Sequence, residues 1–344
     1  ATGFYGSIGP AGAEYIYIAI RRGPMKTPTT GTSVFSPTIW TGNGTTGRTL
    51  ATGLSSPPDM AITQWRNGTQ SNLLWDKLRG FSTTAGGYSE YLRTPSTGGG
   101  SAIANYFYIP DMVNFGFGAI AAGSQQSNGS GETLVGWSFA RAPSFFDEVC
   151  YTGTGAVRTL NHNLAVAPEM MIVKVRGANS GSWRVYHSAL GPTKLITLNL
   201  TNAAATLSTI WNDTAPTSSV FTVGTYGEVN LSGDTFVAYL FATCAGVSKV
   251  GSYTGTGATQ TIDCGFTGGA RFVLIKRTDS TGDWYVWDTA RGMVAGTDPY
   301  LLLDTADAEV NANNVYTTGV GFQIVGTGAG INASGGSYIY LAIA

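Results

Sequence analysis

The stretch Asn230-Leu-Ser-Gly-Asp-Thr-Phe-Val237 decides the fold, because closely related stretches occur at two other places in the chain. They read Asn128-Gly-Ser-Gly-Glu-Thr-Leu-Val135 and Asn332-Ala-Ser-Gly-Gly-Ser-Tyr-Ile339, and the three asparagines follow one another at an interval of 102 residues. Each copy places Asn, Ser and Gly, which favour turns, before apolar or β-branched residues, which favour a strand. Recurrence at a fixed interval indicates a chain built from similar units.

Two further motifs accompany this stretch, in the same order in each unit. The first reads Trp40-Thr-Gly-Asn-Gly44, Tyr151-Thr-Gly-Thr-Gly155 and Tyr253-Thr-Gly-Thr-Gly257. The second reads Trp75-Asp-Lys-Leu-Arg-Gly80, Tyr186-His-Ser-Ala-Leu-Gly191 and Trp287-Asp-Thr-Ala-Arg-Gly292. Their order and nearly constant spacing predict three copies of a module of about 100 residues. The predicted modules are residues 31–146, 147–247 and 248–344, and the first is the divergent one.

The second module gives the clearest prediction of secondary structure. Apolar and β-branched runs, which we interpret as strands, occupy residues 170–176, 183–186, 195–200, 220–223 and 236–241. Short strands at this density, separated by turns rich in Gly and Asn, favour a β-sandwich. The predicted fold class is therefore all-β, with three tandem β-sandwich modules. Because the linkers between them are short, we expect the modules to stack as a stiff rod.

The first 30 residues are predicted to hold the terminal strand of an incomplete module and a linker. Tyr15-Ile-Tyr-Ile-Ala-Ile20 closely matches Tyr338-Ile-Tyr-Leu-Ala-Ile343, the last strand predicted for the third module. Either further modules lay upstream, or this strand pairs with a neighbouring module or chain. An edge strand without a partner is prone to aggregation.

The composition excludes several classes of function. The chain of 344 residues has 19 basic and 20 acidic side chains, so its net charge is −1, and charged residues make up 11% of it. A typical soluble domain has about 25%, and proteins that grip nucleic acid or an anionic membrane present basic patches. No apolar stretch reaches the roughly 20 residues of a bilayer span. We therefore expect neither a nucleic-acid partner nor membrane insertion.

Candidate catalytic and metal-binding residues are few. His162 and His187 are the two histidines, and the repeats align them with residues of other types, which argues against a catalytic role common to the modules. Asp304-Thr-Ala-Asp-Ala-Glu309 brings together three carboxylates, which suit Ca²⁺, but the other modules lack them. We predict no catalytic residue, no metal site and no cofactor. Three scattered cysteines fit buried free thiols better than a disulfide framework: Cys150, Cys244 and Cys264.

Aromatic side chains are the remaining resource for binding, with 8 Trp and 17 Tyr in the chain. An exposed ring beside Asn and Asp side chains can hold a sugar by stacking and hydrogen bonds. The predicted glycan contacts are Trp65, Trp183, Trp211 and Trp284. The alternative interpretation is that these rings close the ends of the sandwich cores.

The motifs of the second module resemble tandem modules in virion proteins of tailed bacteriophages, which include tail-fibre proteins. The residues that carry the resemblance are Tyr151-Thr-Gly-Thr-Gly155, Ile172-Val-Lys174, Trp183-Arg-Val-Tyr-His-Ser-Ala-Leu-Gly191, Trp211-Asn-Asp-Thr-Ala-Pro-Thr-Ser-Ser-Val-Phe221 and Phe236-Val-Ala-Tyr-Leu-Phe241. It covers residues 147–344 well and 31–146 more loosely. The resemblance implies an adhesive or structural part of a virion surface, with no enzymatic residue to carry over.

We therefore expect a non-enzymatic structural protein of a phage virion, a tail-fibre or spike segment that contacts a host-surface polysaccharide. Expected partners are other virion proteins and copies of this chain, with a homotrimer by analogy to tail fibres. The expected location is the virion surface, after assembly in the bacterial cytoplasm. The first alternative is a capsid-decorating or head-fibre protein. Alternatives of other classes are a secreted array of carbohydrate-binding modules and a depolymerising tailspike, and a hydrolase needs a carboxylate pair in a cleft.

Overall fold

The computed structural model describes residues 25–45, 47–82, 87–104, 108, 114–117, 128–177 and 179–344. These residues form antiparallel sheets and a few short helical turns, so the predicted all-β class is confirmed. The strand predicted at residues 15–20 lies outside the described residues. Within the described part, three large sheets are each accompanied by a smaller sheet, and we call each such pair a unit.

Unit 1 contains β1 to β8. Its large sheet has the order β1-β8-β3-β4-β5-β6, and its smaller sheet pairs β2 with β7. The short 3-10 turn η1 (Gly31–Ser33) precedes β1. The strands are β1 (Phe35–Thr41), β2 (Arg48–Ala51), β3 (Met60–Trp65), β4 (Leu73–Asp76), β5 (Tyr88–Arg93), β6 (Ser101–Ala104), β7 (Asn114–Phe117) and β8 (Thr133–Phe139).

Unit 2 contains β9 to β16. Its large sheet has the order β14-β13-β12-β11-β16-β9, and its smaller sheet pairs β10 with β15. The elements are β9 (Phe146–Thr152), β10 (Arg158–Asn161), β11 (Met170–Val175), β12 (Arg184–His187), β13 (Lys194–Thr197), β14 (Ala205–Thr206), α1 (Ser208–Trp211), β15 (Val220–Val223), α2 (Gly227–Asn230) and β16 (Thr235–Phe241).

Unit 3 contains β17 to β24. Its large sheet has the order β17-β24-β19-β20-β21, and its smaller sheet has the order β18-β23-β22. The elements are β17 (Ser248–Thr254), β18 (Gln260–Asp263), β19 (Phe272–Arg277), β20 (Trp284–Asp288), β21 (Leu301–Leu302), β22 (Val315–Thr317), β23 (Gly321–Ile324), α3 (Ala329–Asn332) and β24 (Ser337–Ile343).

The three large sheets share one topology. In each, the last strand of the unit lies between the first strand and the central strand, as β16 lies between β9 and β11. The registers coincide as well, because Phe139, Phe241 and Ile343 each pair with the first residue of the central strand. Residues at equal places in the three units can therefore be compared directly.

The central strand β11 shows how each large sheet is packed, since all six of its residues are buried. Met171, Val173 and Val175 face the small sheet of their own unit. Met170 and Ile172 point to the opposite face and join a core that contains residues of all three units. Alternate side chains of a strand point to opposite faces, so the large sheet is covered on both sides rather than half-exposed.

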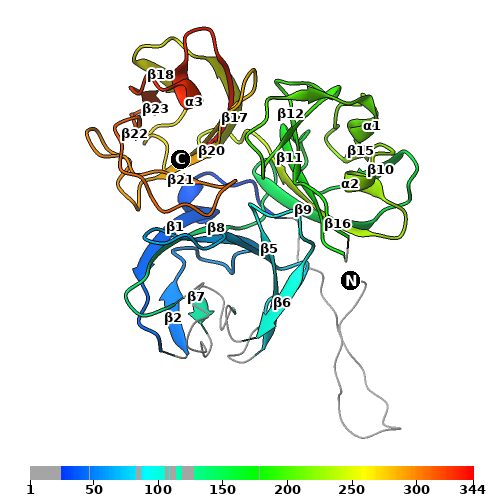
Figure 1. Ribbon diagram of the computed structural model, residues 1–344, viewed down its shortest axis with the longest axis horizontal. Coiled ribbons are helices and arrows are strands. Elements are labelled where there is room, and N and C mark those ends of the chain that lie inside the picture. Colours follow the sequence, from blue (N-terminus) through cyan, green and yellow to red (C-terminus); the bar gives the residue numbers. More distant parts are fainter. Residues whose placement is uncertain are drawn as a thin grey trace, which may run out of the picture.

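The shared core holds the units together around a common centre. It includes Phe35 and Phe139 of unit 1, Phe241 of unit 2, and Phe272 and Ile343 of unit 3. Figure 1 shows the units as three lobes grouped around this centre. A cavity of about 30 Å³, lined by apolar side chains of all three units together with Thr94, lies inside the shared core.

The prediction that the modules stack as a rod is wrong. The face of each large sheet that points away from its own small sheet is buried in this shared core. The strand pattern places apolar residues on both faces of the sheet. It does not indicate which element covers the second face. The proposed division into domains at residues 146 and 247 stays a prediction, since β9 begins at Phe146 and β17 at Ser248 but the core is common.

The repeated Asn-x-Ser-Gly stretch is explained by a buried asparagine. The Nδ2 of Asn230 donates to the carbonyls of Ala156 and Gly224 at 2.6 and 2.7 Å, and its Oδ1 accepts from the backbone N–H of Thr154. Asn332 makes the equivalent bonds in unit 3. The side chain thus ties the Thr-Gly-x-Gly turn to the segment before the last strand, which explains why the first and third motifs recur together.

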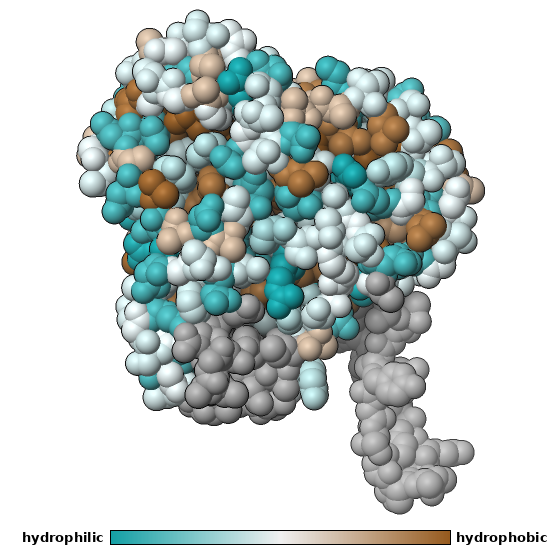
Figure 2. All heavy atoms as spheres, in the orientation of Figure 1, coloured by the Kyte–Doolittle hydropathy of each residue, from teal (hydrophilic) through white to brown (hydrophobic). Residues whose placement is uncertain are grey.

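The visible surface is polar and mixed. Figure 2 shows hydrophilic and weakly polar residues over most of this face, with hydrophobic residues in separate small patches. Among the described residues no helix has the length and apolarity that a membrane span requires.

Candidate functional site

Two of the predicted glycan contacts, Trp183 and Trp284, lie in the interfaces between units. Both are fully buried. The indole N–H of Trp284 in unit 3 donates to the carbonyl of Thr197 in unit 2 at 2.9 Å. The N–H of Trp183 in unit 2 lies 3.1 Å from the carbonyl of Arg93 in unit 1. A ring enclosed by protein cannot stack on a sugar, so the prediction is corrected for these two residues.

Trp211 and Trp65 differ from each other in exposure. Trp211 is fully buried inside unit 2, where its N–H donates to the carbonyl of Lys194 at 3.1 Å, so it too is removed from the predicted glycan contacts. Trp65 is half-buried, and its ring lies against Gly68, where a Cβ would come within 2.3 Å of it. A sugar contact at Trp65 stays a prediction.

Unit 1 completes the pattern of the two interfacial tryptophans with an asparagine. Asn72 occupies the place of Trp183 and Trp284, and its Nδ2 donates to the carbonyls of Leu302 and Leu303 in unit 3 at 3.1 and 3.3 Å. Unit 2 therefore donates to unit 1, unit 3 to unit 2, and unit 1 to unit 3. Head-to-tail contacts that close after three steps make a ring.

Backbone hydrogen bonds join the same pairs of units, with the donor and acceptor units exchanged. The N–H of Gly100 donates to the carbonyl of Arg176, Ala204 to Thr278, and Glu309 to Arg66, at 3.1, 2.9 and 2.8 Å respectively. Each bond joins the segment after one unit's β5, β13 or β21 to the end of the next unit's central strand. The ring is thus closed by hydrogen bonds as well as by apolar packing.

Two buried lysines reinforce the interfaces. The ammonium of Lys174 donates to the carbonyl of Thr97 in unit 1 at 2.8 Å, and that of Lys276 donates to the carbonyl of Thr201 in unit 2 at 2.9 Å. Burial lowers the pKa of each lysine to about 8. Gln64 holds the same place in unit 1 and donates to the carbonyl of Leu302 at 3.1 Å. The lysines are therefore bound to carbonyls and do not face a reaction site.

The residue at the last position of β4, β12 and β20 differs between the units. It determines which polar group lies in each interface. It is Asp76 in unit 1, His187 in unit 2 and Asp288 in unit 3. Asp76 accepts a hydrogen bond of 2.5 Å from the hydroxyl of Tyr239 in unit 2. Asp288 accepts one of 2.9 Å from the indole of Trp137 in unit 1. Each aspartate is also ion-paired with the arginine three residues later, Arg79 or Arg291.

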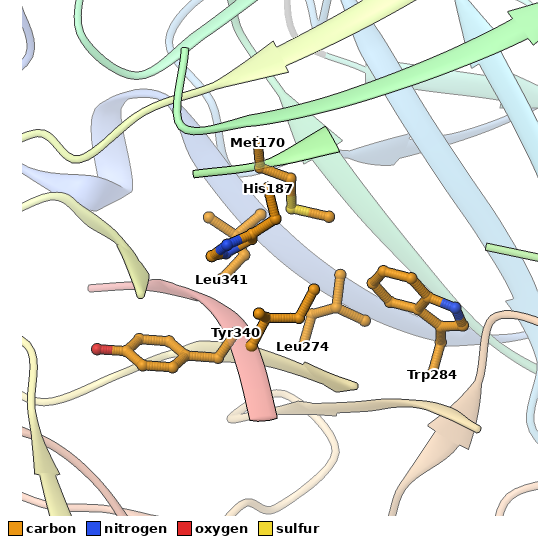
Figure 3. Close-up of a pocket in the computed structure, with 7 residues that line it drawn as sticks. Met170, His187, Leu274, Trp284, Tyr340 and Leu341 are labelled. Carbon is orange, nitrogen blue, oxygen red and sulfur yellow. The ribbon is translucent and has the colours of Figure 1, made fainter. Parts of the chain in front are cut away.

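Among the described residues, no side chain of unit 3 is hydrogen-bonded to His187 in this way. Figure 3 shows His187 and Met170 of unit 2 and Leu274, Trp284 and Leu341 of unit 3 around a small pocket, with the ring of Tyr340 pointing away from it. The Nδ1 of His187 accepts from the backbone N–H of Ala189 at 3.2 Å, whereas Nε2 lies near the backbone of Tyr340 but outside hydrogen-bond geometry. The pocket has no room for a water molecule. Burial lowers the pKa of His187 to about 4.

A buried carboxyl group lies between units 1 and 2. Glu148 of β9 is 2% exposed, and neither of its oxygens has a hydrogen-bond partner among the described residues. Burial, together with the charges of Asp76 and Asp59, raises the pKa of Glu148 well above its usual value. A protonated carboxyl group is the form that such a site favours.

The remaining candidate residues do not converge on a site. His162 accepts from the N–H of Leu164 and bonds the carbonyl of Thr217, inside the loops of unit 2. Asp304 accepts from the N–H of Trp284, and Glu309 pairs with Arg66 at 2.8 Å.

Burial raises the pKa of Cys264 to about 12, which disfavours the nucleophilic thiolate. Within the described ranges, no group of three His, Cys, Asp or Glu side chains is placed to hold a metal ion.

An open pocket of unit 2 with polar residues in its lining does not appear among the sequence predictions. It has a volume of about 270 Å³ and lies between the end of β11 and α2. Its lining residues are Val175, Asn179, Ser180, Tyr226, Gly227, Glu228, Leu231 and Asp234. The residues come from two loops that are about 50 positions apart, so no local motif marks the pocket. The sequence signal for this pocket is the combination of Asn, Asp and an aromatic residue in these two loops.

The polar groups of this pocket are held in place by the surrounding protein. Asp234 accepts from the Nδ2 of Asn179 at 3.0 Å and from the backbone N–H of Thr235 at 2.8 Å. Glu228 accepts from the backbone N–H of Ser182 at 3.0 Å and is ion-paired with Arg184. The guanidinium of Arg184 also lies over the ring of Tyr226, 5.5 Å from its centroid.

Comparison with known proteins gives a family but no function. No curated protein matches the chain. A family model matches residues 30–344, which include all three units. The chain therefore belongs to the family described as a domain of unknown function, DUF7483.

Proposed function

We propose that this chain is a non-enzymatic structural protein of a phage virion, a tail-fibre or spike segment that adheres to glycans of the host surface. The observation that carries the proposal is where the buried polar and aromatic side chains lie and what they bind. The interfacial tryptophans, lysines and aspartates bind neighbouring units, and an open pocket of unit 2 is available for a ligand. A closed ring with polar outer loops suits a particle component that must be rigid.

Two features further support this proposal over an enzyme. The buried carboxyl Glu148 lies 2% exposed inside an interface, where a polysaccharide cannot reach it. A glycosidase needs two carboxyl groups about 5–10 Å apart in an open cleft, and Glu228 and Asp234 of the open pocket are bound by Arg184 and Asn179. The proposed role is therefore binding without cleavage.

The ring also bears on the partners. The three units make in one chain the head-to-tail contacts that separate subunits of a cyclic trimer would make. A homotrimer of this chain would have to use other surfaces, and the proposed partners are other virion proteins and copies of this chain. Many copies on a particle would let weak glycan contacts sum to firm attachment.

Labelled electron microscopy of the phage particle tests the proposal. We expect an antibody against this chain to label the tail fibres or spikes of intact virions. Label spread over the capsid would favour a decorating or head-fibre protein instead, and no label on the particle would refute a virion role. Release of reducing ends from host polysaccharide by the purified chain would contradict the non-enzymatic part.

A further inference from the structure

We propose that the pocket beside Tyr226 is a sugar-binding site that accepts neutral sugars and amino sugars and rejects acidic ones. This inference rests on the glycan adhesion proposed above and assigns it to one place in the molecule. The argument uses the shape of the pocket, the hydrogen-bonding groups on its rim and its balance of charge.

The shape and the apolar surface suit a sugar ring. The pocket of about 270 Å³ is slightly below the roughly 300–1,000 Å³ of pockets that enclose drug-sized ligands. Val175 is a buried aliphatic side chain in its lining, and Leu231 is 45% exposed beside it. Tyr226 is half-buried and contributes an aromatic ring with a polar hydroxyl, the combination that lets one side chain both pack and hydrogen-bond.

The rim is preorganised to accept hydrogen bonds. An ionised carboxylate has about four sites that can accept, and Asp234 uses two of them, for Asn179 and Thr235. The exposed amide and hydroxyl of Asn179 and Ser180 add groups that both donate and accept. Sugar hydroxyls and ammonium groups can donate to the acceptors that remain.

The charge balance decides which sugars fit. Glu228 and Asp234 line the pocket, and Arg184 is the cation paired with Glu228. The buried ammonium of Lys174 also interacts electrostatically with Glu228. Neither cation lines the pocket, so the charged groups that face a ligand are the two carboxylates. Like charges at short distance repel strongly where water is partly excluded. A uronate carboxylate would meet this repulsion, whereas a neutral sugar would not and an amino sugar would be attracted.

Unit 3 provides an internal comparison. Glycine stands at each of the three positions that correspond to Tyr226, Glu228 and Asp234, namely Gly328, Gly330 and Gly336. The scaffold is the same, since α3 and β24 follow each other as α2 and β16 do. A Cβ on Gly330 would lie 2.6 Å from the hydroxyl of Tyr285, so the space is filled by that side chain. Unit 2 therefore has an aromatic ring and two carboxylates at positions where unit 3 has glycine.

Calorimetric titration of the full chain with three trisaccharides tests the proposal. The probes are chitotriose, which is neutral, its de-N-acetylated counterpart, which is cationic, and tri-galacturonate, which is anionic. We expect the first two to bind and the third to bind at least about tenfold more weakly. Tyr226→Ala should weaken binding of the first two about tenfold. Asp234→Asn should weaken the cationic probe and strengthen tri-galacturonate relative to chitotriose by about threefold.

Tyr88→Ala is the matched control, because Tyr88 belongs to unit 1 and its side chain is 72% exposed, more than any other large hydrophobic residue that the structure describes. It should leave all three affinities unchanged, and circular dichroism should show that every variant is folded. Binding that persists in Tyr226→Ala, or that favours tri-galacturonate, would overturn the proposal, as would no binding of any probe. None of these outcomes changes the labelling of virions, so failure of the pocket and failure of the virion role are distinguishable.

Discussion

The interface between units 1 and 2 and the interface between units 2 and 3 occupy equal places in the ring but differ in chemistry. At the first, Asp76 accepts a hydrogen bond from Tyr239 of the neighbouring unit and is paired with Arg79. At the second, His187 meets Leu341, and its Nε2 is outside hydrogen-bond geometry. The backbone and tryptophan contacts of the two interfaces are otherwise alike.

This difference teaches that the ring does not depend on one set of polar side chains. Apolar packing and backbone hydrogen bonds close all three interfaces, and the polar position at the end of β4, β12 or β20 only adjusts how each interface responds to substitution and pH. The interface with Asp76 should be sensitive to the loss of one charged partner, and the interface with His187 to acid.

Asp76→Ala should have the largest effect on stability. It leaves Arg79 buried without its partner, and breaking a buried ion pair in this way costs about 3–5 kcal/mol. Urea titration measures this loss as a change in the free energy of unfolding. Asp279→Ala is the control, because its pair with Arg277 is partly exposed and should contribute less than about 1 kcal/mol. Equal losses for the two variants would contradict the role given to Asp76.

His187→Leu should remove an acid-sensitive contribution at the second interface. Burial lowers the pKa of His187 in the folded chain to about 4, below its ordinary 6.5. Between these values the unfolded chain binds the proton and the folded chain does not, so stability falls as the pH drops through this range. The fall amounts to roughly 3 kcal/mol. Urea titrations at pH 7 and pH 4 should show a smaller loss for His187→Leu than for the unchanged chain, and identical losses would refute the prediction.

Glu148→Gln, at the first interface, should change the pH dependence of stability in the opposite direction from His187→Leu. The pKa of Glu148 is raised in the folded chain, so its contribution is greatest at acid pH and falls as the pH rises through the folded value. Gln keeps the shape without the charge and should stabilise the chain at pH 8 by about 1 kcal/mol or more. The gain should shrink at pH 4, where the carboxyl group is protonated. An equal or larger gain at pH 4 would contradict a raised pKa of Glu148.

Trp183→Phe and Trp284→Phe should have the smallest effects and should be similar to each other. Each removes one indole N–H donor and leaves a small cavity, which together cost about 1–2 kcal/mol. The N–H of Trp183 is shared between the carbonyls of Arg93 and Ser96, and that of Trp284 is bound to the carbonyl of Thr197. Thermal unfolding followed by circular dichroism compares the two variants. A large difference between them would mean that the two interfaces differ in packing as well as in the polar position.

Much of the fold was predictable from local patterns. The repeated motifs located the turns, and the buried asparagines Asn230 and Asn332 explain why these residues recur at a fixed interval. The candidate site was harder to predict. Trp183 and Trp284 were expected to be exposed after turns, and they are buried because the neighbouring unit covers them. No pattern along one strand reports what packs against its outer face.

The sequence by itself determined that the chain is all-β, low in charge and internally repeated, because turn residues, strand periodicity and composition are local properties. Only the tertiary structure decided that the units close a ring around a shared core instead of a rod. It also decided that tryptophans predicted for ligands bind neighbouring units, and that the residues of the open pocket come together from two distant loops. Contacts between units depend on shape and on distances across the core, which a linear pattern does not contain.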